Sequence, residues 1–252
     1  MLNEIINKEL NVLGYKGMLS SFKENLELKK LSLNFQETFY KLIQAEMSHK
    51  SARSLSYRLE LAKLPRILTF DQFDLDNVPF AKEKLTLLRQ FNFIENSENI
   101  LIIGGAGTGK THIALSLGYE ALKDYRVKFY RFIDLAKQLK DAQKNNKLDS
   151  LIIRLKNFDL LIIDELGYLP IDEVSGELLF ELFSNLYETT STIITTHLNF
   201  DEWNTIFGSK KSTKAIIDRI THHCQILETG NKSWRLKSTL ERLKNKKGGV
   251  IK

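Results

Sequence analysis

The sequence is short of cysteine, proline and long hydrophobic runs, and each shortage excludes a class of protein. Cys224 is the only cysteine among 252 residues, so an intramolecular disulfide is impossible and a thiolate zinc cluster is excluded. The three prolines argue against long disordered linkers. No run approaches the roughly 18 apolar residues of a membrane span, and the N-terminus lacks the apolar segment of a signal peptide. We therefore expect a cytoplasmic globular protein with no membrane partner.

Positive charge is concentrated near the C-terminus. The formal net charge is +6, and residues 230–252 contain eight Lys or Arg against one acid, Glu241. The rest of the chain contains 29 basic and 30 acidic residues and is nearly neutral. A basic tail favours contact with a polyanion such as DNA, although a solvated, flexible terminus explains the same composition equally well.

Residues 104–111 read GGAGTGKT and match the phosphate-loop pattern GxxxxGK[ST]. Its glycines let backbone N–H groups turn inward around phosphate, Lys110 reaches the outer phosphates and the Thr111 hydroxyl meets Mg²⁺. The apolar run at 100–103 suits a buried strand, and a helix after Lys110 directs its positive end toward the phosphates. The dinucleotide pattern GxGxxG is excluded because its third glycine would fall at Lys110. The predicted nucleotide site consists of Gly104, Gly105, Ala106, Gly107, Thr108, Gly109, Lys110 and Thr111.

Four further apolar runs predict the rest of a β-sheet, and helical periodicity separates them. A strand, a helix and a strand in succession form the parallel crossover unit, so we expect an α/β fold. The predicted strands are residues 127–132, 160–163, 192–196 and 225–227.

The N-terminal part is expected to form a small all-α domain. Apolar residues recur there at helical spacing up to about Lys63, with breaks expected at Gly14 and Gly17, and Pro65 ends the region. We expect a helical domain at 1–65, a nucleotide-binding domain at 66–245 and a basic tail at 246–252. Arg53 and Arg58 share a basic stretch of the helical part, which is either a DNA-binding face or simply a solvated one.

Phe70 and Phe73 follow Pro65 in a stretch with no sustained period. They are candidates to pack near the nucleotide base, although aromatic residues in a linker more often join domains.

The apolar run at 160–163 leads into Asp164 and Glu165, and the third predicted strand ends in these two acids. The carboxyl end of a strand in such a sheet lies beside the ligand crevice, where an aspartate can hold Mg²⁺ and the next acid can polarise a water. Thr195, Thr196 and His197 end the next strand and are candidates for a γ-phosphate sensor, or they simply terminate the strand.

His222, His223 and Cys224 adjoin, which suggests a metal site. We reject this interpretation, because neighbouring side chains on an extended chain point to opposite faces and a fourth ligand is not evident.

The phosphate loop belongs to a set of segments that resembles one known family. The segments read GGAGTGKTHIALSLG, LLIIDELGYLP, HLNFDEW, IIDRITHH and SWRLK. Together they resemble IstB, the ATPase helper of insertion-sequence transposases, with DnaC-type helicase loaders as near relatives. The resemblance covers essentially the whole chain and implies an AAA+ ATPase with strand order 5-1-4-3-2. It also implies ATP and Mg²⁺ as cofactors, a homo-oligomer assembled on DNA largely independently of sequence, and recruitment of a partner transposase.

By resemblance, Lys110 and Thr111 are the Walker A pair, Asp164 and Glu165 the Walker B pair, and Arg219 an arginine finger offered to a neighbouring subunit. One segment departs from the family pattern: relatives commonly read Ser-Asn-Leu where this chain has Thr-His-Leu at 196–198, so histidine replaces the expected asparagine sensor.

Three functions compete at this stage: a transposase helper, a helicase loader and a small-molecule kinase with the same phosphate loop. A kinase usually has an arginine-rich lid over the phosphates. This chain instead has an adjacent Asp-Glu pair and Arg219, which are typical of hydrolysis by an attacking water. The predicted DNA contacts are Arg53, Arg58, Lys244, Lys246 and Lys247.

Overall fold

The computed structural model describes residues 2–27, 32–73, 82–207 and 210–231. The chain divides into two compact units, Met1–Tyr57 and Arg58–Lys252, and the division falls within helix α3 (Leu33–Ala62). The domain boundaries expected from the sequence stay predictions. In the part of the chain that is described, no helix is long and apolar enough to cross a membrane.

The first unit is all-α, as predicted. It contains α1 (Leu2–Val12), α2 (Lys16–Glu27) and the first part of α3. The apolar faces meet in a small core of Ile6, Leu10, Phe22 and Ile43. Gly14, with φ +75°, ends α1 as predicted, whereas Gly17 lies inside α2 and the break expected there is wrong.

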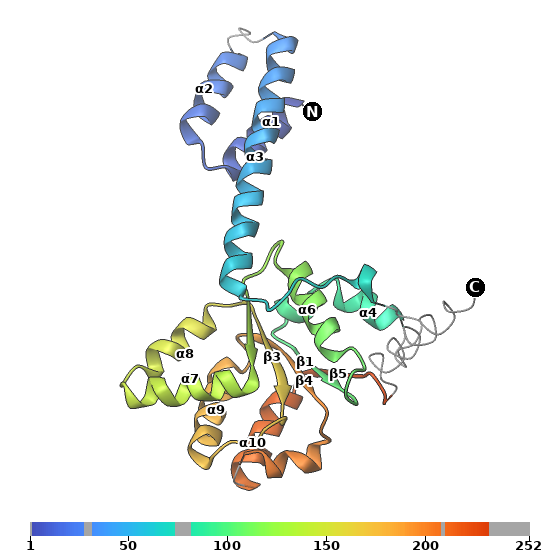
Figure 1. The fold of residues 1–252 in the computed structure, drawn as a ribbon. Helices are drawn as coiled ribbons and strands as arrows, with labels where there is room; N and C mark the ends of the chain where they lie inside the picture. The colour runs from blue at the N-terminus through green and yellow to red at the C-terminus, as the bar shows by residue number, and fades with distance from the viewer. Residues whose placement is uncertain (1, 28–31, 74–81, 208–209, 232–252) are drawn as a thin grey trace, which may run out of the picture. The chain divides into compact units, whose positions relative to one another are not determined.

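A five-stranded parallel sheet forms the centre of the second unit (Figure 1). Its order is β2-β3-β4-β1-β5, which is the expected order 5-1-4-3-2 read from the other edge. The central strands are buried along most of their length because helices cover both of their faces, and β1 and β3 each contain a continuous apolar run. The strands are β1 (Asn99–Ile103), β2 (Val127–Arg131), β3 (Leu160–Leu166), β4 (Ser191–Thr196) and β5 (Cys224–Glu228).

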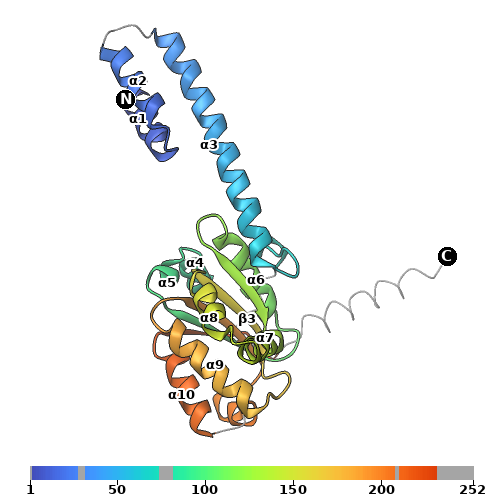
Figure 2. The same ribbon diagram turned by 90° about the vertical axis from the view of Figure 1, so that its left-hand side faces the viewer.

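Side chains alternate between the two faces of the sheet and meet different helices. On one face α6 (Lys110–Ala121) packs so closely that a Cβ on Gly118 would overlap Ile162. On the other face Leu101, Leu161 and Ile194 share a core with four helices, of which α9 and α10 run side by side (Figures 1 and 2). These helices are α7 (Phe132–Lys144), α8 (Leu148–Lys156), α9 (Glu173–Leu186) and α10 (Lys210–Thr221).

Short elements complete the second unit. They are η1 (Phe70–Gln72), α4 (Lys82–Leu88), α5 (Asn92–Glu95) and η3 (Phe200–Thr205). The parallel sheet gives the unit two distinct edges: the carboxyl ends of the strands, where the phosphate loop begins, and the amino ends, where α10 leads into β5.

Candidate nucleotide site

The phosphate loop connects the end of β1 to the start of α6. Gly107 and Gly109 have φ of +76° and +96°, a left-handed conformation that side chains rarely adopt. A Cβ at Gly109 would also overlap the ring of Phe73. Glycine is therefore required at Gly109 by both conformation and space, and the loop backbone can turn around an anion at the N-terminus of α6.

Lys110 folds back over this loop. Its Nζ donates hydrogen bonds to the carbonyl oxygens of Gly104 and Gly105, each at 2.8 Å. The ammonium group is thus held at the loop, where the phosphates of a nucleotide would exchange these carbonyl contacts for contacts with negatively charged oxygens.

The chain just after β5 braces the first half of the loop. Thr229 N donates to Ile103 O at 2.8 Å, and Gly105 N donates to Gly230 O at 2.9 Å. The hydroxyls of Thr229 and Thr108 lie 2.6 Å apart. Sequence reasoning missed this brace, and the only local signal is a glycine after the last predicted strand.

Asp164 lies at the centre of a hydroxyl cluster beside the loop. Thr111 Oγ1 donates to its two carboxylate oxygens at 2.9 and 3.1 Å, and Thr195 Oγ1 donates to Oδ1 at 2.5 Å. The Asp164 side chain is buried, with 4% of the residue exposed. A hydroxyl and a carboxylate beside a phosphate loop form the oxygen donor set that Mg²⁺ prefers, so Thr111 and Asp164 fit that ion.

Glu165 lies at an irregularity in strand β3. The pairing of β3 with β4 shifts register between Ile163 and Leu166, and Glu165 has φ +63°. A bulge of this kind re-aims a side chain, and the left-handed conformation costs about 1–3 kcal/mol in a residue other than glycine. Glu165 is accordingly exposed while Asp164 is buried. The strand was predicted to end in these two acids, and β3 includes both and continues one residue further, to Leu166.

The three candidate sensor residues occupy different positions. Thr195 contacts Asp164 and also accepts a hydrogen bond from Glu165 N at 3.0 Å. Thr196 is buried, and its hydroxyl donates to Leu166 O at 2.9 Å and accepts from Leu198 N at 3.1 Å. His197 is exposed, and its ring forms no hydrogen bond within the described residues. The structure therefore brings Thr195 to the acid pair, while the Thr196 hydroxyl is engaged by the backbone.

The two aromatic residues after Pro65, Phe70 and Phe73, also occupy different positions. Phe73 lies against Gly109, and its ring centroid is 4.9 Å from that of His112. Phe70 is buried, with the guanidinium of Arg89 5.1 Å from its ring centroid. Phe73 is therefore the aromatic side chain next to the phosphate loop.

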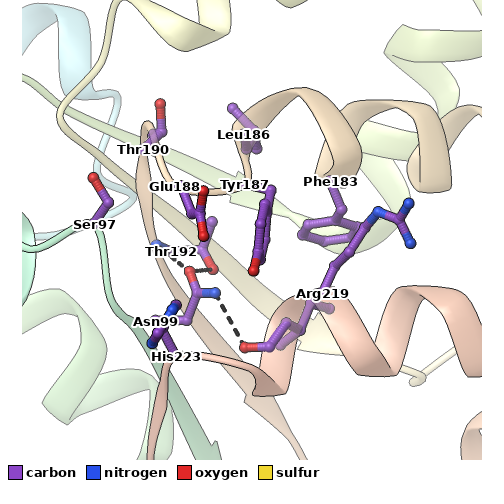
Figure 3. A pocket seen from close by; sticks show the side chains of 11 residues that line it. Ser97, Asn99, Phe183, Leu186, Tyr187, Glu188, Thr190, Thr192, Arg219 and His223 are labelled. Carbon is purple, nitrogen blue, oxygen red and sulfur yellow. Dashed lines mark hydrogen bonds between the residues drawn. The ribbon is translucent and has the colours of Figure 1, made fainter.

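Arg219 lies at the opposite edge of the sheet. Asn99 and Cys224 pair at the amino ends of β1 and β5, and Asn99 Nδ2 donates to Ile220 O at 3.0 Å, which fixes the end of α10 there (Figure 3). Strand β1 spans about 13 Å between this edge and the phosphate loop. The Arg219 guanidinium stacks 4.5 Å from the ring centroid of Phe180. Arg219 is thus outside its own nucleotide site.

The structure describes two of the five predicted DNA contacts, Arg53 and Arg58. Arg53 is exposed on α3 in the first unit. Arg58, in the second unit, donates to the carbonyl oxygens of Lys123 and Asp124 and so is engaged within the fold. The remaining residues, Lys244, Lys246 and Lys247, lie outside the described residues.

A basic cavity was missed by the sequence analysis. Lys63, Lys128 and Arg154 line a cavity of about 570 Å³ beside the edge strand β2, together with Tyr130 and Phe158. Burial lowers the pKa of Lys128, and the positive charges of Lys63 and Arg154 lower it further. The cations are brought together from three separate parts of the sequence, so sequence spacing carries no signal for them.

The two adjacent histidines were predicted to lie on an extended chain, and this is wrong. His222 and His223 lie in the turn between α10 and β5, and their rings meet edge to face with centroids 4.3 Å apart. Cys224 begins β5, and burial raises the pKa of its thiol to about 11, so it is a thiol and not a thiolate at neutral pH.

The glycine loop, the acid pair and the 5-1-4-3-2 parallel sheet define an ATP-binding P-loop protein of the AAA+ fold. More narrowly, the chain belongs to the family of IstB-like ATP binding proteins, whose model matches residues 8–242. The resemblance inferred from the sequence is confirmed.

The relatives are ATP-binding proteins of insertion sequences. The chain is 36% identical over 208 residues to that of IS5376 from Geobacillus stearothermophilus, covering 82% of this chain and 83% of the relative. It is 34% identical over 224 residues to the ATP-binding protein of IS21 from Pseudomonas aeruginosa, and the match covers 88% of this chain and 82% of the relative.

Solved structures show a similar fold. A DNA replication initiation factor matches with a TM-score of 0.54 and 25% identity, and the match covers 72% of this chain and 55% of that one. The DnaC helicase loader matches with a TM-score of 0.50, covering 64% of this chain and 95% of the loader. At 20% identity, the second likeness is one of fold alone.

Proposed function

We propose that this protein is a Mg²⁺-dependent ATP hydrolase that assembles on DNA and assists an insertion-sequence transposase in selecting its target. One observation carries the proposal: Lys110, Thr111 and Asp164 gather at one edge of the sheet, while Arg219 lies at the other. An arginine placed there is suited to a neighbour's nucleotide, so the active site is complete only in an assembly. The relatives' association with insertion sequences supports the role in transposition.

Each residue near the loop has a chemical task in this proposal. Thr111 and Asp164 hold Mg²⁺, which when bound neutralises charge on the β- and γ-phosphate oxygens. Lys110 binds the outer phosphates, and Glu165 accepts a proton from the attacking water. Thr195 acts through its hydrogen bonds to Asp164 and to the backbone of Glu165, and is a positioning residue.

The assignment of parts to domains is also a proposal. The helical part at 1–65 binds DNA or the transposase, residues 66–245 form the ATPase, and the tail at 246–252 adds charge for DNA. In the second unit, the basic cavity defined by Lys63, Lys128 and Arg154 supplies cations beside two aromatic rings. Cations with aromatic faces suit a nucleic-acid backbone and its bases.

A transposition assay with purified components tests the proposal. A candidate partner transposase is combined with ATP, target DNA and either the wild-type protein or Glu165→Gln. We expect wild-type protein to stimulate insertion and to consume ATP, and Glu165→Gln to bind ATP without hydrolysing it.

The alternative function, loading of a replicative helicase, is tested in parallel. The ATP-bound protein is offered the transposase and a replicative hexameric helicase from the same cell in separate sedimentation experiments. Binding of the helicase without binding of the transposase would replace the proposed function with the loader function.

A further inference from the structure

Three potential metal ligands meet at the amino edge of the sheet, away from the nucleotide site. Glu188, His222 and His223 each offer one ligand atom, and these atoms all lie within 4.8 Å of one another. In the part of the chain that is described, they are the one group of three or more His, Cys, Asp or Glu side chains with this geometry. We propose that Glu188, His222 and His223 form a zinc-binding site.

The site is assembled from two segments 34 residues apart. Glu188 follows the end of α9, and the two histidines follow the end of α10, which packs beside α9. Glu188 has φ +55°, a left-handed conformation that is uncommon outside glycine. Figure 3 shows Glu188 and His223 on the side of the pocket away from the Arg219 guanidinium. The packing of the helices, and not the local sequence, brings the ligands together.

Tyr187 orients one of the histidine rings. Its hydroxyl lies 2.8 Å from Nδ1 of His222. When Nδ1 carries the proton and donates to this hydroxyl, Nε2 has a free lone pair for a metal. Histidines that bind metals usually have such a partner on the other ring nitrogen. Tyr187 is therefore a positioning residue in the proposed site.

Two imidazoles and one carboxylate are a ligand set for Zn²⁺ with an open fourth position, which water can fill. In a tetrahedral site with bonds of about 2.1 Å, ligand atoms lie roughly 3.4 Å apart, so no pair of these ligand atoms has to approach by more than about 1.4 Å. Small rotations of exposed side chains supply such a movement, and all three residues are exposed. Imidazole also favours Zn²⁺ over Mg²⁺, which prefers oxygen ligands.

The zinc site is separate from the residues that are proposed to bind ATP in the same chain. It lies at the amino edge of the sheet, three residues beyond Arg219 in sequence, whereas Asp164 and Thr111 lie at the carboxyl edge. Binding of zinc can therefore be measured without nucleotide, and loss of the zinc site leaves ATP binding unchanged.

Titration of the untagged full-length protein with Zn²⁺ tests the site. Calorimetry is carried out without nucleotide and with saturating Mg²⁺, which occupies the oxygen-only sites. We expect one equivalent of Zn²⁺ to bind, and the affinity to fall at least tenfold in His222→Gln, His223→Gln and Glu188→Gln. Tyr187→Phe should retain one equivalent with about 10- to 100-fold weaker binding.

Matched controls separate the site from adventitious histidine binding. His49→Gln removes an exposed histidine from the first unit and should bind Zn²⁺ like the wild type. Co²⁺ in place of Zn²⁺ should give visible absorption in the wild type and His49→Gln but not in His223→Gln.

The proposal is overturned if the wild type binds no equivalent of Zn²⁺, or if His223→Gln and Glu188→Gln both bind it with wild-type affinity. Circular dichroism confirms that each variant is folded. If one histidine variant fails to fold, the other and Glu188→Gln decide the outcome. ATP affinity measured in the same preparations reports on the nucleotide site separately.

Discussion

At the scale of single residues, two adjacent acids beside the phosphate loop lie in opposite environments. Asp164 is buried and accepts hydrogen bonds from Thr111 and Thr195, whereas Glu165 is exposed in a left-handed conformation. A regular strand would also direct neighbouring side chains to opposite faces, one of them into the helices. The bulge lies at this acid pair, where Asp164 is buried and Glu165 is open to water.

The exposed acid is expected to serve hydrolysis and not binding. Glu165→Gln keeps the shape of the side chain but cannot accept the proton, so ATP should bind with wild-type affinity and turnover should fall by about 10²- to 10⁴-fold. Calorimetry and a phosphate-release assay measure the two quantities. Wild-type turnover in this variant would remove Glu165 from the mechanism.

Thr195 is expected to act through Asp164. Thr195→Val keeps the shape of the side chain but leaves a buried carboxylate oxygen without its 2.5 Å hydrogen bond, a loss of roughly 1.5–3 kcal/mol for a charged partner. We expect kcat to fall about tenfold or more and half-maximal activity to require more Mg²⁺. Thr195→Ser retains the hydroxyl and should restore both values; equal defects in the two variants would indicate a packing role instead.

At the scale of elements, α9 connects the two edges of the sheet. Its N-cap is Asp172, which follows the acid pair in the chain. The Asp172 carboxylate accepts a hydrogen bond from Ser175 N at 2.9 Å and so caps the helix. It ends at Leu186, beside the proposed zinc site. Lys140 of α7 also bonds to Asp172, so the start of α9 is tied to a neighbouring helix.

The cap of α9 should make stability depend on pH in a defined direction. Hydrogen bonds from Lys140 and Ser175 hold the pKa of the Asp172 carboxyl well below its usual range. The folded state therefore binds this proton less readily than the unfolded state, and the stabilisation is present above the ordinary aspartate pKa of about 3.9. It is lost as the pH falls below that value.

Thermal melts of Asp172→Ala and Asp172→Asn measure this contribution. At neutral pH, Asp172→Ala should melt at a lower temperature than the wild type, because it removes both the cap and the ion pair. Asp172→Asn retains a good cap and should melt between them. The difference between the wild type and Asp172→Ala should shrink as the pH falls below about 3.9; a constant difference would show that Asp172 is not ionised in this role.

At the scale of the whole molecule, Arg219 lies away from the nucleotide site of its own chain. Asn99 fixes the end of α10 at the amino edge of the sheet, about one strand length from Lys110. In the proposed assembly, each chain therefore contributes its phosphate loop to one active site and its Arg219 to another.

Mixing two inactive variants tests this arrangement. Neither Arg219→Ala nor Glu165→Gln should turn over ATP alone, because each lacks one side of the shared interface. In mixed assemblies, an Arg219→Ala subunit retains Glu165 and receives Arg219 from its neighbour, so part of the activity should return. Mass photometry must first show that the variants assemble together. If they do and no activity returns, Arg219 does not act in trans.

The basic cavity should contribute to DNA binding through charge. Each phosphate contact releases a counterion, so Arg154→Ala should weaken binding on any sequence and reduce the slope of log K against log salt by about 1. Fluorescence anisotropy over a salt series measures the slope. Arg126→Ala is a suitable control, since Arg126 pairs with Asp159 and does not line the cavity. Equal slopes for Arg154→Ala and the wild type would place DNA elsewhere.

The sequence alone determined the fold class, the phosphate loop and the identity of the acid pair. These features are local: apolar runs of strand length, glycines at fixed spacing and acids directly after a buried run all report on neighbours along the chain. The strand order came from the family resemblance, because spacing alone does not say which strands pair.

Only the tertiary structure decided which side chains meet. Three such contacts join residues about 30 or more positions apart in the sequence. They are the contact of Thr195 with Asp164, of Thr229 with Thr108, and of Glu188 with His222. Sequence periodicity says which face a residue occupies, but a bulge or a turn changes that face without changing the pattern. Contacts between distant segments depend on how helices and strands pack, and the sequence pattern carries no direct record of that packing.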